Sequence, residues 1–131
     1  MKSSNPDDRA VLAKLDLLGA LISARDPTVV DELWSGMEFR LVGSQEGEIA
    51  ASREELVALM AGLFAKPCRI SWAWKDRTVT RSGDLAWVCT ECDLVLAYPD
   101  RTERRPYRMV CIFQKIDDRW IWRLYSGSEP V

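Results

Sequence analysis

Two acidic residues are the side chains best placed for proton chemistry. Glu91 and Asp93 lie two residues apart in a segment rich in β-branched and apolar residues, so on a strand they share one face, about 7 Å apart. Neighbouring carboxylates in an apolar setting raise each other's pKa and can serve as acid and base. Cross-strand ion pairs with Arg108 or Arg123 are the alternative. The spacing leaves both interpretations open.

Two further side chains could contact a ligand. Tyr107 could donate a hydrogen bond to a carbonyl oxygen, although a tyrosine at a strand edge commonly keeps its hydroxyl in solvent. Arg40 could bind an anionic group, or it could pair with an acid such as Glu38 or Glu48. A pocket that holds these groups would accept a small apolar or carbonyl-containing ligand.

The chain has four cysteines and no histidine. Cys89 and Cys92 form a CxxC, but it lies in an expected strand, where residues three apart point to opposite faces. Cys68 and Cys111 stand alone. We therefore expect reduced thiols in the core, no metal site and no cofactor. Without histidine, proton chemistry falls to carboxylates, tyrosine, cysteine or lysine.

The size and charge of the chain limit its partners. A length of 131 residues suits one domain, and we expect a single domain over residues 1–131 with 1–5 as a disordered tail. The formal net charge of −2 provides no basic field for nucleic acid or anionic membranes. The richest apolar stretch, Leu15 to Ile22, is too short to span a bilayer. We expect a cytoplasmic protein with no nucleic-acid or membrane partner.

Three helices are expected in the first half of the chain. Each begins with a capping signal and continues with apolar residues at helical spacing. They run from about Pro6 to Arg25, from Asp26-Pro27-Thr28 to Trp34, and from the capping box Ser52-Arg53-Glu54-Glu55 to a stop at Pro67. Their apolar stripes are most simply core faces.

A long meander of strands is expected to follow the helices. Aromatic and β-branched residues between turn signals predict strands at Glu38 to Val42, Arg69 to Ser82, Asp84 to Tyr98, Arg105 to Ile116 and Arg119 to Ser126. Ser82-Gly83-Asp84 and Asp117-Asp118 would be tight turns, and Pro99 to Pro106 a longer hairpin tip. The fold class is therefore α+β, with an antiparallel sheet covered by helices.

The expected sheet is apolar on both faces. Ala86 and Val88 belong to one face of the third strand, while Trp87 belongs to the other. Because three helices can cover only one face, the other face is expected to pack against a second copy of the chain. The expected aromatic anchors, at the dimer interface or the pocket rim, are Trp72, Trp74, Trp87, Trp120 and Trp122. Of these, Trp74 and Trp122 are the expected ligand contacts, together with Arg40.

The order of these motifs resembles the nuclear transport factor 2-like superfamily. The resemblance extends from Asp8 to Pro130 and is closest to the SnoaL-like branch, which is related to the association domain of calcium/calmodulin-dependent protein kinase II. It rests on the two opening helices, the strand at Phe39 to Leu41, the helix start Ser52-Arg53-Glu54-Glu55-Leu56, the strand Gly83-Asp84-Leu85-Ala86-Trp87-Val88 and the Trp120 strand. The resemblance implies a cone-shaped curved antiparallel sheet wrapped round helices, a pocket at the open end and a dimer through the sheet.

The resemblance carries over no catalytic residue. Many relatives end with histidines on alternate residues, where this chain has Leu124 and Ser126. The acidic base and oxyanion donors of the steroid isomerases in this superfamily likewise lack counterparts here, since Leu15 and Leu18 occupy the first helix.

Three functions follow from these expectations. The first is a binding protein for a small molecule of unknown identity, with an apolar pocket. The second is a cofactor-free isomerase, cyclase or dehydratase, in which Glu91 or Asp93 is the base and Tyr107 or Arg40 stabilises an enolate. The third is an oligomerising adaptor domain.

Overall fold

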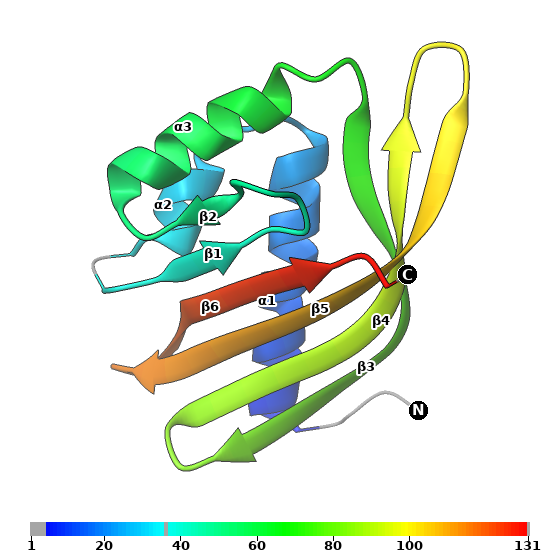
Figure 1. The fold of residues 1–131 in the computed structure, drawn as a ribbon. Coiled ribbons are helices and arrows are strands. Elements are labelled where there is room, and N and C mark those ends of the chain that lie inside the picture. The colour runs from blue at the N-terminus through cyan, green and yellow to red at the C-terminus, as the bar shows by residue number, and fades with distance from the viewer. Residues whose placement is uncertain (1–4, 36, 131) are drawn as a thin grey trace.

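The computed structural model describes residues 5–35 and 37–130. Within these residues, the three helices and two short strands of the first half of the chain precede four long strands, and the strands form one sheet (Figure 1). The elements are α1 (Pro6–Ser23), α2 (Val29–Leu33), β1 (Arg40–Val42), β2 (Ile49–Ala50), α3 (Arg53–Phe64), β3 (Arg69–Ser82), β4 (Leu85–Ala97), β5 (Thr102–Ile116) and β6 (Arg119–Ser128). The predicted α+β class is confirmed. The expected tail at residues 1–5 lies outside the described residues except for Asn5.

The strands form one curved sheet in the order β2-β1-β6-β5-β4-β3. The four long strands are antiparallel, as expected, but β1 pairs with β6 in parallel. Strand β2, which was not predicted from the sequence, is a pair of residues at the edge of the sheet, antiparallel to β1. The sheet is therefore mixed beside its β2 edge, and the meander begins at the opposite edge, with β3.

The helix starts follow the capping signals in the sequence. The Asn5 side chain accepts hydrogen bonds from the backbone N–H groups of Asp7 and Asp8, at 2.8 and 3.3 Å. Ser52 caps α3 through the N–H of Glu55. The first helix ends at Ser23, two residues before the predicted end, because Arg25 takes a positive φ of 55° and leaves the helix.

Turns and bulges give the sheet its curvature. Asp117 and Asp118 both have positive φ, as a two-residue hairpin of the expected kind requires. The β4–β5 hairpin tip is shorter than predicted, because β5 begins at Thr102. Register shifts follow Trp74 in β3 and Ile112 in β5, and bulges of this kind bend a sheet.

One end of the interior is closely packed. Phe113 and Trp122 lie 4.4 Å apart between ring centroids, and neither side chain is exposed. The indole N–H of Trp122 donates to Glu32 of α2 at 2.8 Å, and Leu15 of α1 belongs to the same core. Among the described residues, no helix combines the length and apolar character needed to cross a membrane.

Candidate functional site

The other end of the interior contains a cavity of about 410 Å³. Its walls come from all three helices, the loop between β1 and β2, the upper parts of β3, β4 and β5, and the end of β6. In Figure 1 the upper parts of β3, β4 and β5 rise beside the end of α3. Much of the wall is apolar, with side chains that include Leu18, Met60, Leu63, Leu94 and Leu96.

A pair of tyrosines forms the polar centre of the wall. The hydroxyl oxygens of Tyr107 on β5 and Tyr125 on β6 lie 2.6 Å apart, and both side chains are buried. Burial raises the pKa of Tyr107 to about 12 and the pKa of Tyr125 well above its ordinary value. Both hydroxyls therefore stay protonated near neutral pH.

Gly127 makes room for this pair. A Cβ atom at Gly127 would lie 1.7 Å from the Tyr107 hydroxyl oxygen, which is far inside van der Waals contact. Any larger residue would have to displace the ring of Tyr107. The glycine on β6 thus fixes where the hydroxyl pair lies.

Charged groups lie elsewhere on the cavity wall. Glu129 accepts hydrogen bonds from the side chains of Ser44, at 3.0 Å, and Gln45, and it lies 3.6 Å from Arg105. Glu48 accepts from the backbone N–H of Gln45 at 2.8 Å. These carboxylates are already held by local donors. Lys66 also lines the cavity and is exposed.

Tyr107 is the one residue of the expected catalytic group that lines the cavity. Glu91 lies 3.7 Å from Arg108, and Asp93 lies 3.2 Å from Arg104. Neither acid lines the cavity, because both point to the outer face of the sheet while Cys92 between them is buried on the inner face. The cross-strand pairing with Arg108, which was the alternative interpretation, is present.

The three expected ligand contacts also lie outside the cavity wall. Arg40 is exposed and pairs with Glu38 at 2.8 Å. Trp74 stacks on Trp72, with ring centroids 6.1 Å apart, and only Trp72 reaches the wall. Trp122 is buried in the closely packed end, because its ring fills the space between Phe39 and Phe113.

Tyr125, Glu48 and Glu129 are cavity residues that the sequence analysis did not assign to the site. For Tyr125, the alternation of side chains along the strand did not predict the inner face, because the bulge in the β5–β6 hairpin decides which face this residue occupies. The sequence indicated that Tyr107 could place a hydroxyl in the pocket, but it gave no indication that Tyr125 would pair with it.

The cysteines show no sign of a metal centre. Cys68, Cys92 and Cys111 are buried, Cys89 is exposed and all four are free thiols. Burial raises the pKa of the Cys92 thiol to about 11, so it stays protonated near neutral pH. In the part of the chain that the structure describes, no three His, Cys, Asp or Glu side chains gather as they would around a metal ion.

Solved structures show the same fold at low sequence identity. A proposed dehydratase of the nuclear transport factor 2-like family from Streptomyces avermitilis has a TM-score of 0.81 and 16% identity, over 97% of this chain and 99% of that one. A proposed calcium/calmodulin-dependent protein kinase II association domain from Xanthomonas campestris has a TM-score of 0.78 and 21% identity, over 98% and 94%. A nuclear transport factor 2-like protein with a cystatin-like fold from Novosphingobium aromaticivorans has a TM-score of 0.76 and 18% identity, over 94% and 81%.

No curated protein matches the sequence. The family comparison is more direct, because the SnoaL-like domain matches residues 11–131, which is nearly the whole chain. The helix-covered curved sheet and its cavity agree with that match. The chain therefore belongs to the SnoaL-like domain family and has the nuclear transport factor 2-like, cystatin-like fold.

Proposed function

We propose that the protein binds a small, mainly apolar molecule in the cavity between α3 and the upper strands. The observation that carries the proposal is the cavity itself, whose volume of about 410 Å³ falls in the range of small-molecule sites. Its wall combines many leucine side chains with a few polar groups, which is the usual composition of such sites.

Two leucines on α1 offer a matched test. Leu18 lines the cavity, whereas Leu17, one residue earlier, is 42% exposed on the outside of the same helix. Leu18→Trp would place an indole in the cavity, and Leu17→Trp would place the same group in solvent. Calorimetric titration with 2-ethylnaphthalene should give saturable 1:1 binding to wild type and Leu17→Trp, and binding to Leu18→Trp weakened by at least about tenfold.

Two outcomes would contradict the proposal. One is the absence of saturable binding to wild type by 2-ethylnaphthalene and by the smaller ethylbenzene. The other is equal affinity for wild type and Leu18→Trp, which would place the hydrocarbon outside the cavity. Circular dichroism of each variant provides the control for folding.

A second candidate is a cofactor-free isomerase, cyclase or dehydratase in the same cavity. Such an enzyme needs a carboxylate beside the substrate, and Glu48 and Glu129 line the cavity where Glu91 and Asp93 do not. In a screen of carbonyl compounds, this function predicts turnover that Glu129→Gln or Glu48→Gln abolishes. Turnover that survives both changes would show that neither carboxylate is the base, and the absence of turnover by wild type would contradict this second candidate.

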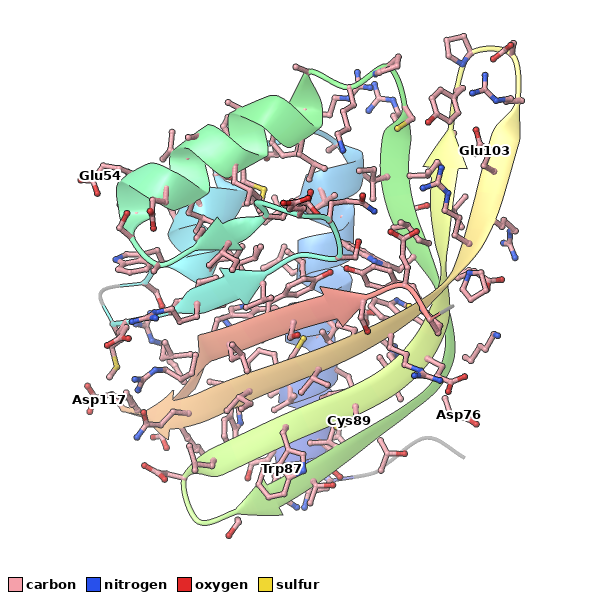
Figure 2. The ribbon with its side chains drawn as sticks, in the orientation of Figure 1. Glu54, Asp76, Trp87, Cys89, Glu103 and Asp117 are labelled. Atoms are coloured by element: carbon pink, nitrogen blue, oxygen red, sulfur yellow. The ribbon has the colours of Figure 1, made fainter. Side chains whose placement is uncertain are left out.

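We also propose that two copies associate through the outer face of the sheet. Trp87, Ile112 and Leu124 are neighbours across β4, β5 and β6, and Val110 beside them is 37% exposed. Figure 2 shows Trp87 and Cys89 on the face of β4 that points away from α1. An apolar patch on this face favours self-association.

Light scattering tests this association. At micromolar concentration the wild type should have about twice the subunit mass of 14.9 kDa, and Val110→Lys should shift the protein toward the monomer. A wild-type mass that stays at 14.9 kDa would contradict the dimer.

A further inference from the structure

Glu48 places a carboxylate on the cavity wall without a cationic partner. The residue is half-buried, and one of its carboxylate oxygens, Oε1, accepts a hydrogen bond from the backbone N–H of Gln45 at 2.8 Å. Among the described residues, no lysine or arginine forms an ion pair with it, and its other oxygen, Oε2, accepts no hydrogen bond. An opposite charge stabilises a partly buried carboxylate, and a molecule in the cavity is placed to provide one.

The other charged groups on the wall are already balanced or lie in solvent. Glu129 lies 3.6 Å from Arg105, and Arg105 lies 3.3 Å from a second acid, Glu103. Lys66 is exposed, so water and salt screen its charge. Among the described residues that line the cavity, Glu48 is therefore the one whose charge is both partly buried and unpaired.

Aromatic side chains from three strands line the same cavity. They are Trp72 on β3, Tyr107 on β5 and Tyr125 on β6. The rings of Trp72 and Tyr125 lie 6.5 Å apart between centroids and are tilted by 56°, so they form a corner and not a flat stack. The paired hydroxyl oxygens of Tyr107 and Tyr125 keep lone pairs that can accept a further hydrogen bond. Aromatic rings attract cations through their negative faces.

The charge of Glu48 reaches this aromatic corner. Burial is the main cause of the raised pKa of Tyr107, and the negative charge of the Glu48 carboxylate adds to it. The carboxylate is thus near enough to act on the Tyr107 hydroxyl through space. A negative charge beside the tyrosine pair favours a positively charged group there.

We propose that Glu48 and the aromatic side chains of Trp72, Tyr107 and Tyr125 form a subsite for an organic ammonium group. The proposal rests on the proposed binding function and specifies the class of ligand: a protonated amine with an apolar body. The body lies among the leucines of α1, α3 and β4. The carboxylate accepts a charge-assisted hydrogen bond from the ammonium, and the rings add cation–π attraction. An anionic ligand would be repelled by Glu48.

Three naphthalene probes of similar size isolate the contribution of charge. 2-Ethylnaphthalene is neutral, 2-naphthylmethylamine carries an ammonium group near neutral pH in place of the terminal methyl, and 2-naphthoate carries a carboxylate. Glu48→Gln removes the negative charge and keeps a side-chain oxygen for the N–H of Gln45. Its matched control is Glu46→Gln, because Glu46 belongs to the same loop, is exposed and does not line the cavity.

Calorimetric titration near neutral pH should separate the three probes. Wild type should bind 2-naphthylmethylamine at least about tenfold more tightly than 2-naphthoate. In Glu48→Gln, affinity for the ammonium probe should fall about tenfold or more, the loss expected for a hydrogen bond to a charged group. The same variant should keep its affinity for 2-ethylnaphthalene. Glu46→Gln should bind all three probes as wild type does.

The outcomes distinguish the two proposals. If 2-ethylnaphthalene binds but Glu48→Gln weakens it and the ammonium probe equally, or weakens neither, the ammonium subsite is wrong and the binding function stands. Wild type that binds 2-naphthoate as tightly as the ammonium probe overturns the subsite too. This comparison needs no variant, so it decides even if Glu48→Gln fails to fold. If none of the three probes binds wild type, the binding function fails and the subsite fails with it.

Discussion

The two ends of the protein's interior are built on the same strands but are filled differently. At one end, Phe113 and Trp122 pack together and the Trp122 indole has a partner in Glu32. At the other end, Tyr107 on β5 and Trp72 on β3 face a cavity of about 410 Å³, and the Trp72 indole has no partner among the described residues. One end has the features of a completed core. The other has open space, which is the feature of a site for a further molecule.

Removing a large ring should distinguish the two ends most strongly. Phe113→Ala should lower the free energy of unfolding by about 3–5 kcal/mol, because it opens a hole in a closely packed region. Leu63→Ala, on the partly buried cavity side of α3, should cost less than about 2 kcal/mol, because its surroundings are already open. Urea unfolding measures both losses. Equal losses would mean that the cavity end is as closely packed as the other.

Replacing a leucine with the larger tryptophan should also destabilise the closely packed end more than the cavity end. Leu15 is fully buried in the packed end of α1, and Leu18, one turn later, lines the cavity. Leu15→Trp should destabilise the fold by about 1–3 kcal/mol or more, since a filled core resists a larger side chain. Leu18→Trp should stay within about 1 kcal/mol of wild type. If Leu18→Trp were the more damaging change, the cavity would not provide the space assigned to it.

Alkaline pH should reveal the buried hydroxyl pair. The folded-state pKa of Tyr107 is about 12, above the ordinary value of 10.0, so the unfolded chain loses this proton first as pH rises. Stability present below pH 10 should therefore be lost between pH 10 and 12. Between pH 10 and 11, wild type should lose about 1 kcal/mol more than Tyr107→Phe. Parallel pH curves would mean that the Tyr107 hydroxyl is solvated.

The smallest effect is expected on the outer face. Glu91 and Arg108 are both more than half exposed and lie 3.7 Å apart, so Glu91→Gln should change the free energy of unfolding by less than about 0.5 kcal/mol. Binding of 2-ethylnaphthalene should also be unaffected. A loss of binding in this variant would link the outer face to the cavity and break the separation between them.

Sequence patterns predicted the elements well because the signals are local. The cap at Ser52 and the hairpin turn at Asp117 and Asp118 are formed by the residues named for them, and Asn5 caps the helix that was predicted to start at Pro6. The extent of β4 was predicted to within one residue at each end. Strand β2 was missed because two residues beside a short edge strand carry too little pattern.

The composition of the site could not be predicted in the same way. A regular β5–β6 hairpin would place Tyr125 on the face opposite Trp122, since they are three residues apart. The register shift after Ile112 turns Tyr125 to the inner face, opposite Cys111. The alternation of side chains along β4 correctly predicted that Glu91 and Asp93 share one face. It could not predict which face lines the cavity, because that depends on where the helices pack.

The most direct test of the contrast between the two ends is diffraction from crystals of the protein held under xenon. Xenon enters open apolar cavities and is excluded from closely packed regions. We predict xenon density among Leu18, Met60 and Leu94, and none beside Leu15 or Phe113. Density absent from the first place, with the surrounding side chains closed together, would contradict the assignment of this end of the molecule as a binding cavity.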